Sequence, residues 1–466
     1  MLRCDHEQDV ALTLSRYLVA TEPIRVAGGP LSRVILSTRS GATIVVSELI
    51  WQSACAADWD AIPDPVLRAL REQLVAVSTA ENELRTVLDD NSRAIAADLV
   101  LEQVIQPSAA CQLGCDYCGQ EHRAIHMSPQ VQSRLLERIE QRLANGNSNG
   151  EIYETLRVGW FGAEPLLGLG AMRRLSPSLS DLAKKYNARY ASRVVTNGLR
   201  LTPVIARELQ ERHSVEHVEI TLDGTANVHD QRRATKSGKP SFDRIFGNLV
   251  AIASCDYIKF VIAVRCNVDQ FNVENVPELI DQIADAGIHE RVGLYFSPVY
   301  DWGNGAQHRS IDSDEYASRE VMWFGQMMRR GFHVDLIPPR RKIVCLAVRP
   351  GGTVTDARGN EFNCTEAPQV PSYGDPNRYS TGTVSGEKRA EPYFRSFGES
   401  IAKGEVGCGS CQLLPVCGGA CPKSWSDGQA ACPSHKRNIA ERVLLEFARS
   451  RIGRLQESEL HRPMSV

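Results

Sequence analysis

Cysteines are the residues of this sequence whose type and spacing point to chemistry. The chain has 14 cysteines among 466 residues, and most of them fall in two compact groups. The first group is Cys111, Cys115 and Cys118, on a loop that follows an apolar stretch. Three thiolates at this spacing can bind three irons of a 4Fe–4S cluster and leave the fourth iron open to a small molecule. The alternative is a structural zinc ion, with His122 or His126 as its fourth ligand.

The second group lies near the carboxyl end of the chain. It consists of Cys345, Cys364, Cys408, Cys411, Cys417, Cys421 and Cys432. Eight thiolates fill two tetrathiolate clusters, so these cysteines predict one complete site and one site that lacks a protein ligand. A pair of structural zinc ribbons is the alternative, because the C-x2-C spacing serves both chemistries. The scattered cysteines, Cys4, Cys55, Cys255 and Cys266, are expected to be ordinary buried thiols.

The elements that must position the first group alternate between strands and helices. Strands are expected at 101–106, 155–161, 190–195, 216–222, 258–265 and 291–297, and helices at about 129–145, 170–186, 202–212, 242–253, 274–287 and 313–331. This alternation predicts βαβ units and a parallel sheet, an α/β fold. Six such units can form an open or partial barrel of the (βα)6 type, whose chemistry lies at the carboxyl ends of the strands.

The remaining segments differ from this core in composition. Residues 1–98 contain a short hairpin and helix-like segments, which predict a small α+β region. Residues 99–332 are the expected βα core, and 333–445 are rich in Cys, Gly and Pro, as expected where metal ligation replaces a hydrophobic core. Residues 446–466 are expected to be a tail that is frayed from 451 onward.

The charge of the chain is nearly balanced. It carries 53 basic and 56 acidic residues, a net charge of −3, which gives no reason to expect nucleic acid or a membrane surface as a partner. The amino terminus has no apolar signal region, and no uncharged apolar run approaches the roughly 18–20 residues that span a bilayer. We therefore expect a cytoplasmic protein.

The first cysteine group and the ends of the following strands resemble the radical SAM (S-adenosylmethionine) superfamily. The superfamily motif is CxxxCxxC with an aromatic residue before the last cysteine, here Tyr117. WFGAEP at 160–165 resembles the GGEP motif that holds the SAM amino group, with Ala163 in place of the second glycine. TNG at 196–198 and ITLDGTANVHDQRR at 220–233 resemble further motifs of the superfamily. The resemblance implies SAM contacts from Gly162, Ala163, Glu164, Pro165, Asn197, Thr221, Asp223, Arg232, Arg233 and Asn267.

Two of these roles can be stated in chemical terms. Glu164 would accept the SAM ammonium group. Thr221 and one of Arg232 or Arg233 would meet the ribose or the carboxylate.

The second cysteine group resembles the SPASM domain, which carries auxiliary clusters in peptide-maturing radical SAM enzymes. The shared pattern is C-x13-G-x4-C, with Gly359 as its glycine, followed by C-x2-C-x5-C-x3-C and a last cysteine. The resemblance implies one auxiliary cluster on Cys345, Cys364 and Cys421, and a second on Cys408, Cys411, Cys417 and Cys432. Anaerobic sulfatase maturases carry a further cysteine near Gly351 and an acid at the position of Thr365. Both are missing here, so sulfatase maturation is disfavoured.

Together the resemblances imply an oxidoreductase with SAM and three 4Fe–4S clusters, one of which binds SAM. The implied reaction is hydrogen abstraction by a 5′-deoxyadenosyl radical from a ribosomally made precursor peptide, followed by a carbon–carbon or thioether cross-link. Asp223 and Glu366 are the candidate proton acceptors. The implied partners are the precursor peptide and an external one-electron donor of the flavodoxin or ferredoxin type.

Two alternatives remain open. One is a radical SAM enzyme that matures a protein, as sulfatase maturases do, or acts on a small molecule. The other is a non-catalytic iron–sulfur or zinc-ribbon protein. Residues 1–98 faintly resemble the winged-helix domain that captures a precursor peptide as an added strand. They can equally be a scaffold extension.

Overall fold

The structure is a computed structural model that describes residues 11–25, 29–301 and 305–460. The chain divides into two compact units. The barrel unit comprises Ile95–Val334 and Cys345–Ser396, and the terminal unit comprises Met1–Ala94, Asp335–Val344 and Phe397–Val466. These units cross the expected domain boundaries, because the segment 333–445 contributes to both.

A run of six parallel strands forms the centre of the barrel unit. They are β7 (Val100–Ile105), β8 (Thr155–Trp160), β9 (Arg189–Thr196), β10 (Val215–Thr221), β11 (Val261–Val268) and β12 (Val292–Pro298). Each pairs in parallel with the next, so their order in the sheet is their order in the chain. The predicted strands and the open α/β fold are confirmed, with strand ends displaced by three residues or fewer.

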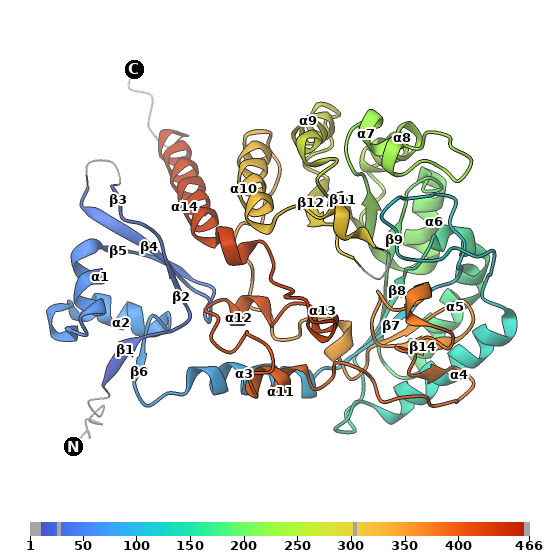
Figure 1. The fold of residues 1–466 in the computed structure, drawn as a ribbon, viewed down its shortest axis with the longest axis horizontal. Helices are drawn as coiled ribbons and strands as arrows, with labels where there is room; N and C mark the ends of the chain where they lie inside the picture. The colour runs from blue at the N-terminus through green and yellow to red at the C-terminus, as the bar shows by residue number, and fades with distance from the viewer. Residues whose placement is uncertain (1–10, 26–28, 302–304, 461–466) are drawn as a thin grey trace. The chain divides into compact units, whose positions relative to one another are not determined.

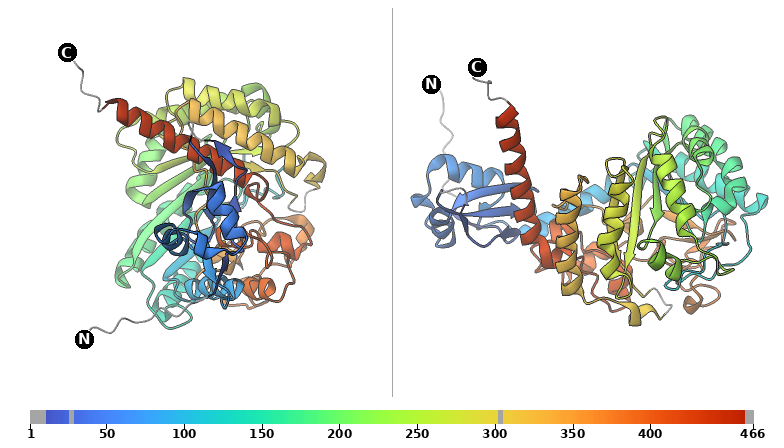
Figure 2. Two further views of the ribbon diagram at one scale, coloured as in Figure 1. Left: turned by 90° about the vertical axis from the view of Figure 1, so that its left-hand side faces the viewer. Right: turned by 90° about the horizontal axis from the view of Figure 1, so that it is seen from above.

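An amphipathic helix follows each of these strands in the chain, and the helices cover one face of the sheet (Figures 1 and 2). They are α4 (Pro129–Asn145), α5 (Leu169–Lys185), α6 (Pro203–His213), α8 (Phe242–Ala253), α9 (Val276–Asp285) and α10 (Ser313–Arg329), with the short α7 (Ala226–Arg232) before α8. In α4 the buried residues Leu135, Ile139 and Leu143 recur every four positions and so share one face. Alternate strand residues such as Leu156, Val158 and Trp160 are fully buried.

Three short strands extend the sheet beyond β7. They are β13 (Thr353–Thr355), parallel to β7, and the antiparallel β14 (Asn360–Phe362) and β15 (Gly382–Thr383). Gly359 forms the turn between β13 and β14 at φ +85°, which accounts for the glycine of the C-x13-G-x4-C pattern. Strands of two or three residues are too short to show an alternating pattern, and the sequence analysis missed them.

The terminal unit joins the amino-terminal strands to the carboxyl-terminal helices. Its elements are β1 (Leu12–Leu14), β2 (Leu18–Ala20), β3 (Ile24–Arg25), β4 (Leu31–Ser37), β5 (Thr43–Ser47), α1 (Glu48–Cys55), α2 (Asp64–Glu72), β6 (Ala76–Ser78), most of α3 (Glu83–Ala96), α11 (Phe397–Ala402), α12 (Leu414–Cys417), α13 (Pro422–Ser426) and α14 (His435–Leu460). Val34 and Leu36 of β4 pack in one core with Val416 of α12 and Val443 of α14. The predicted hairpin corresponds to β4 and β5.

Three further expectations can be compared with the structure. Residues 451–460 continue α14 and are not a frayed tail, whereas 461–466 lie outside the described residues. Among the scattered cysteines Cys266 is buried, Cys255 is partly buried, Cys55 is exposed against expectation, and Cys4 lies outside the described residues. No helix in the described ranges is long and apolar enough to cross a membrane.

Candidate active site

The loop after β7 brings the first cysteine group to one cavity. Cys111, Cys115 and Cys118 line a space of about 140 Å³ at the carboxyl edge of the parallel strands. Burial raises the pKa of all three thiols, that of Cys115 to about 12. Iron binds the thiolate, so metal binding here releases protons. Three thiols around one space fit a cluster with an open iron.

Of the two histidines considered as a fourth zinc ligand, His122 lines this cavity and His126 does not. His122 lines the cavity, with its Nε2 3.7 Å from the Sγ of Cys118. Burial lowers the pKa of His122 to about 4, so its ring is neutral. His126 pairs with Ser108 in an isolated bridge and does not line the cavity. Within the described ranges, no three Cys, His, Asp or Glu side chains form a group that could hold a single metal ion.

The turn after β8 forms a second wall of this cavity. Gly162 has φ +90°, and a Cβ there would lie 2.3 Å from the side chain of Gln106, so only glycine fits without a shift. Ala163, which stands where the motif has its second glycine, has a left-handed backbone conformation at φ +44°. Its N–H donates to the Oε1 of Gln120 at 3.0 Å. The left-handed conformation costs an alanine about 1 kcal/mol relative to a glycine.

Glu164 follows this turn and is fully buried. Its carboxylate accepts hydrogen bonds from the Oγ1 of Thr196 at 2.8 Å and from the backbone N–H groups of Asn197 and Leu166. Burial raises the pKa of Glu164. Glu164 and the buried Pro165 that follows it do not line the cavity. The contact between Glu164 and the SAM ammonium stays a prediction.

The ends of β9 and β10 provide the polar groups of the cavity. Thr196, Asn197 and Thr221 line it, and the Nδ2 of Asn197 lies 3.7 Å from the Sγ of Cys111. The structure thus gathers Gly162, Ala163, Asn197, Thr221 and Arg233 of the expected SAM contacts around the three cysteines.

The structure distinguishes the two adjacent arginines, Arg232 and Arg233, at the end of the 220–233 motif. Arg233 lines the cavity, donates to the hydroxyl of Tyr117 at 2.5 Å, and has a buried Nε without a hydrogen-bond partner among the described residues. A polar ligand would satisfy this Nε. Arg232 instead points to Asp269, with its Nη1 2.6 Å from the carboxylate, and does not line the cavity.

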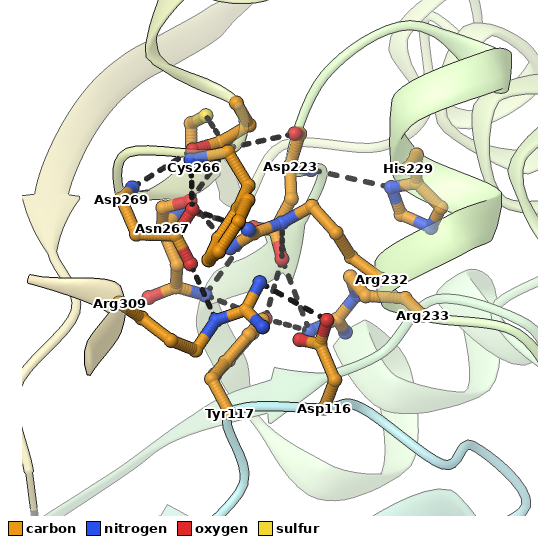
Figure 3. Close-up of polar contacts among 12 residues, drawn as sticks. Asp116, Tyr117, Asp223, His229, Arg232, Arg233, Cys266, Asn267, Asp269 and Arg309 are labelled. Carbon is orange, nitrogen blue, oxygen red and sulfur yellow. Dashed lines mark hydrogen bonds and ion pairs between the residues drawn. The ribbon is translucent and has the colours of Figure 1, made fainter. Parts of the chain in front are cut away.

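A chain of polar contacts, mostly buried but exposed at Asp116, holds the loop of the first cysteine group (Figure 3). Arg309 contacts both Asp116 of this loop at 3.0 Å and Asp269 at 2.8 Å. Asp223 accepts a hydrogen bond from Tyr117 at 2.5 Å and receives the backbone N–H of Asn267 at 2.9 Å. Asp269 and Arg309 escaped the sequence analysis, because only folding brings them to the motif residues. Asp116 and Gln120 lie in or next to the cysteine motif, but their contacts depend on the fold.

A second cavity of about 190 Å³ adjoins the first. Their common wall consists of Tyr117, Cys118, Gln120, Phe161, Val195, Thr221 and Arg233. Glu219, Arg265, Asn267 and Glu366 line only the second cavity. The guanidinium of Arg265 donates to Asn267 at 2.8 Å and to the hydroxyl of Ser297 at 3.0 Å. Glu366 accepts a hydrogen bond from the hydroxyl of Thr365 at 3.1 Å through one carboxylate oxygen.

Four cysteines of the second group surround a separate small cavity within the terminal unit. Cys408, Cys411, Cys417 and Cys432 line this space of about 30 Å³ together with Leu413, Leu414 and Trp425. Burial, helped by the neighbouring thiols, raises the pKa of Cys408 to about 12 and that of Cys417 to about 11. Four thiols facing one mostly apolar space fit a tetrathiolate cluster.

The remaining three cysteines of the second group belong to different units. Cys345 and Cys364 lie in the barrel unit, and Cys421 lies in the terminal unit, where it precedes α13. The cluster expected on these three stays a prediction. A Cβ at Gly351 would lie 2.7 Å from the backbone oxygen of Val100, so a cysteine does not fit there without a shift.

Comparison with known proteins agrees with this site. Residues 105–283 match the family model of the radical SAM superfamily. The cysteine-type anaerobic sulfatase-maturating enzyme of Clostridium novyi is 30% identical over 158 residues, 32% of this chain and 39% of that enzyme. The serine-type enzyme of Bacteroides thetaiotaomicron is 23% identical over 348 residues, 68% of this chain and 81% of that enzyme. The chain spans about two fifths of the length of the curated relatives it matches at 30% identity.

A solved structure shares the fold. Native anSMEcpe with bound AdoMet and the Cp18Cys peptide superimposes with a TM-score of 0.55 at 18% sequence identity. The match covers 77% of this chain and 99% of that one.

An open parallel α/β sheet with a three-cysteine cavity at its carboxyl edge defines a class of enzymes that bind a cluster and a small cofactor in one place. The match over 105–283 makes this segment a radical SAM domain, with SAM and a 4Fe–4S cluster as its cofactors, and the chain an enzyme. The predicted relationship to radical SAM maturases is confirmed.

Proposed function

We propose that this chain is a radical SAM maturase that abstracts a hydrogen atom from a precursor peptide and introduces a cross-link. The observation that carries this proposal is the second cavity, which shares a wall with the SAM cavity and is lined by unlike charges, Glu219, Glu366 and Arg265. A substrate side chain in that space lies against the residues that surround SAM. The anSMEcpe structure with a bound peptide supports a peptide as the substrate.

The residues of the first cavity have defined tasks in this proposal. When bound there, SAM and the cluster would supply the chemistry that removes a hydrogen atom from a substrate carbon. Asn197, Thr221 and Arg233, which line this cavity, would hold SAM through their polar groups. The backbone of Gly162 and Ala163 shapes the space, and Phe161 and Val195 in the common wall exclude water.

Glu366 is the better of the two candidate proton acceptors. Asp223 is fully buried, is engaged by Tyr117 and Asn267, and lines neither cavity. Glu366 lines the substrate cavity and uses one carboxylate oxygen for Thr365. We therefore propose Glu366 as the group that takes the proton lost when the substrate radical is oxidised to product, while one of the proposed auxiliary clusters takes the electron.

The proposal includes two auxiliary clusters and an external electron donor. The four cysteines around the cavity of the terminal unit are the proposed ligands of one cluster. Cys345, Cys364 and Cys421 are the proposed ligands of the other. A one-electron donor of the flavodoxin or ferredoxin type would reduce the enzyme. Leader-peptide capture by the strands of the terminal unit, with β5 at the sheet edge, is the proposed role of the amino-terminal region.

Protein maturation is the second candidate function. The similarity to the Bacteroides thetaiotaomicron enzyme extends over most of both chains and favours it. Thr365 in place of an acid and Gly351 in a site too tight for cysteine weigh against a sulfatase substrate. Activity on a cysteine- or serine-containing sulfatase peptide, with none on short precursor peptides, would establish this second candidate.

The test begins with anaerobic reconstitution and measurement of 5′-deoxyadenosine with dithionite as reductant. We expect SAM cleavage that disappears in Cys115→Ala. Precursor peptides are then assayed by mass spectrometry for loss of two hydrogens. Glu366→Gln should keep SAM cleavage and lose cross-linked product at least tenfold, while exposed Glu290→Gln should match the unchanged enzyme. Normal product formation by Glu366→Gln would refute the role of Glu366.

A further inference from the structure

A cationic side chain contacts one of the four cysteines in the terminal unit. Lys436 lies in the first turn of α14, four residues after Cys432. Its Nζ lies 3.3 Å from the Sγ of Cys432, within hydrogen-bond distance for sulfur, and Lys436 itself lines the cavity of the four cysteines. The ammonium therefore points at a proposed cluster ligand.

A backbone turn at the start of α14 places Lys436 close to Cys432. The backbone N–H of Lys436 donates to the carbonyl of Pro433 at 3.0 Å, which forms a tight turn between Cys432 and the helix. This turn brings the side chain of Lys436 back towards the sulfur of Cys432. Leu413, Leu414 and Trp425 form apolar parts of the same wall, and Lys436 brings a cationic group to its solvent-exposed side.

The physical consequence concerns the reduction potential. A cluster on four thiolates carries net negative charge, and reduction adds another electron. A charge-assisted hydrogen bond to a sulfur ligand stabilises the more negative, reduced form. This stabilisation is largest where the donor is charged. A neutral donor in its place removes only part of it.

We infer that Lys436 is a positioning residue that raises the reduction potential of the cluster held by Cys408, Cys411, Cys417 and Cys432. The inference rests on the cluster assignment of the proposed function. It gives this cluster a specific property, a preference for the reduced form, which suits a site that receives electrons. Neither the cysteine spacing nor the resemblance to SPASM domains contains this information.

The experiment is a redox titration of the full reconstituted chain followed by electron paramagnetic resonance. The signal that disappears in Cys411→Ala belongs to the four-cysteine site and is followed in Lys436→Gln, Lys436→Arg and Lys403→Gln. Lys403 is the matched control, because it is an exposed lysine of the same unit that pairs with Glu399 at 3.6 Å.

We expect Lys436→Gln to lower the equilibrium constant for reduction about tenfold, about 59 mV for a one-electron couple. Lys436→Arg keeps the charge and should stay within about threefold of the unchanged enzyme, and Lys403→Gln should not shift the couple. An unchanged couple in Lys436→Gln would overturn the inference. If Cys411→Ala removes no signal and no iron, the inference falls with this cluster assignment, whereas SAM cleavage still tests the proposed function separately.

Discussion

The cysteine loop after β7 and the cysteine pocket of the terminal unit both present thiols at short spacings, but their surroundings differ. Around Cys111, Cys115 and Cys118 the walls are polar, contain a left-handed turn at Gly162 and Ala163, and continue into a second cavity. Around the four cysteines of the terminal unit the space is small and largely apolar. The first arrangement suits a site that must admit and orient a ligand, and the second suits a closed site.

The number of thiols agrees with this contrast. Three thiols leave one iron of a cluster open, and four leave none. The supporting contacts also differ, because Arg309 holds the open site through ion pairs with Asp116 and with the buried Asp269, whereas the closed pocket forms on turns and short helices next to a hydrophobic core. The number of cysteines and the contacts that support them together distinguish the proposed catalytic site from the proposed electron-storage site.

The strongest way to break this comparison is to remove one thiol from each site. Cys115→Ala should abolish 5′-deoxyadenosine formation. In Cys411→Ala, SAM cleavage in the absence of peptide should still be measurable, but roughly four irons per chain should be lost. Iron analysis and the SAM cleavage assay on both variants provide the measurement. Equal loss of SAM cleavage in both variants would contradict the division of labour between the two sites.

The second prediction concerns the ion pairs that hold the open site. Asp269 is fully buried between Arg232, 2.6 Å away, and Arg309, 2.8 Å away. Asp269→Ala leaves two guanidinium groups without this partner, and we expect a loss of about 3–5 kcal/mol in the free energy of unfolding. Urea unfolding measures it.

The control for this prediction is an exposed pair. Asp89 lies 3.6 Å from Arg85 on α3, and its side chain is half exposed. Asp89→Ala should cost less than about 1 kcal/mol. Similar losses in both variants would show that the buried network does not hold the loop more firmly than a surface pair.

A third prediction uses the pH dependence of the same region. Burial lowers the pKa of His229 to about 4, and its Nδ1 accepts the backbone N–H of Asp223 at 3.2 Å. The unfolded chain takes up this proton below about pH 6.5, but the folded chain stays neutral down to about pH 4. Stability therefore falls as the pH falls through this window, by about 2–3 kcal/mol for this group. Urea unfolding of the unchanged enzyme and His229→Asn at pH 7 and 4.5 should show a smaller loss in the variant; equal losses would argue against a neutral buried His229.

The sequence predicted the barrel well, because its strands and helices are long enough for their periodicity to be visible. It also located the three cysteines and the turn after β8, since these are local patterns. The distinction between Arg232 and Arg233 was beyond it: adjacent residues of one type differ here only in the direction of their side chains. Strands β13 to β15 were beyond it because their pairing depends on distant segments.

The terminal unit shows a different limit. The strands β4 and β5 were predicted from an apolar hairpin, but the shared core of Leu36 with Val416 and Val443 joins segments roughly 400 residues apart. No local pattern indicates such a contact. The domain boundaries expected from composition therefore differ from the compact units of the structure.

The smallest predicted effects come from the turn after β8, where two neighbouring positions should respond in opposite ways. Gly162→Ala places a methyl group against Gln106 and should weaken SAM binding about tenfold, a cost of about 1.4 kcal/mol. Ala163→Gly relieves about 1 kcal/mol of backbone strain and loses a similar amount to the greater freedom of the unfolded chain. Its stability should therefore change by less than about 0.5 kcal/mol, and its SAM affinity by less than about twofold. Calorimetric SAM titration of the reconstituted variants measures both affinities. A large loss of affinity in Ala163→Gly would mean that the methyl group itself contacts SAM, and the open site would then depend on a side chain that glycine lacks.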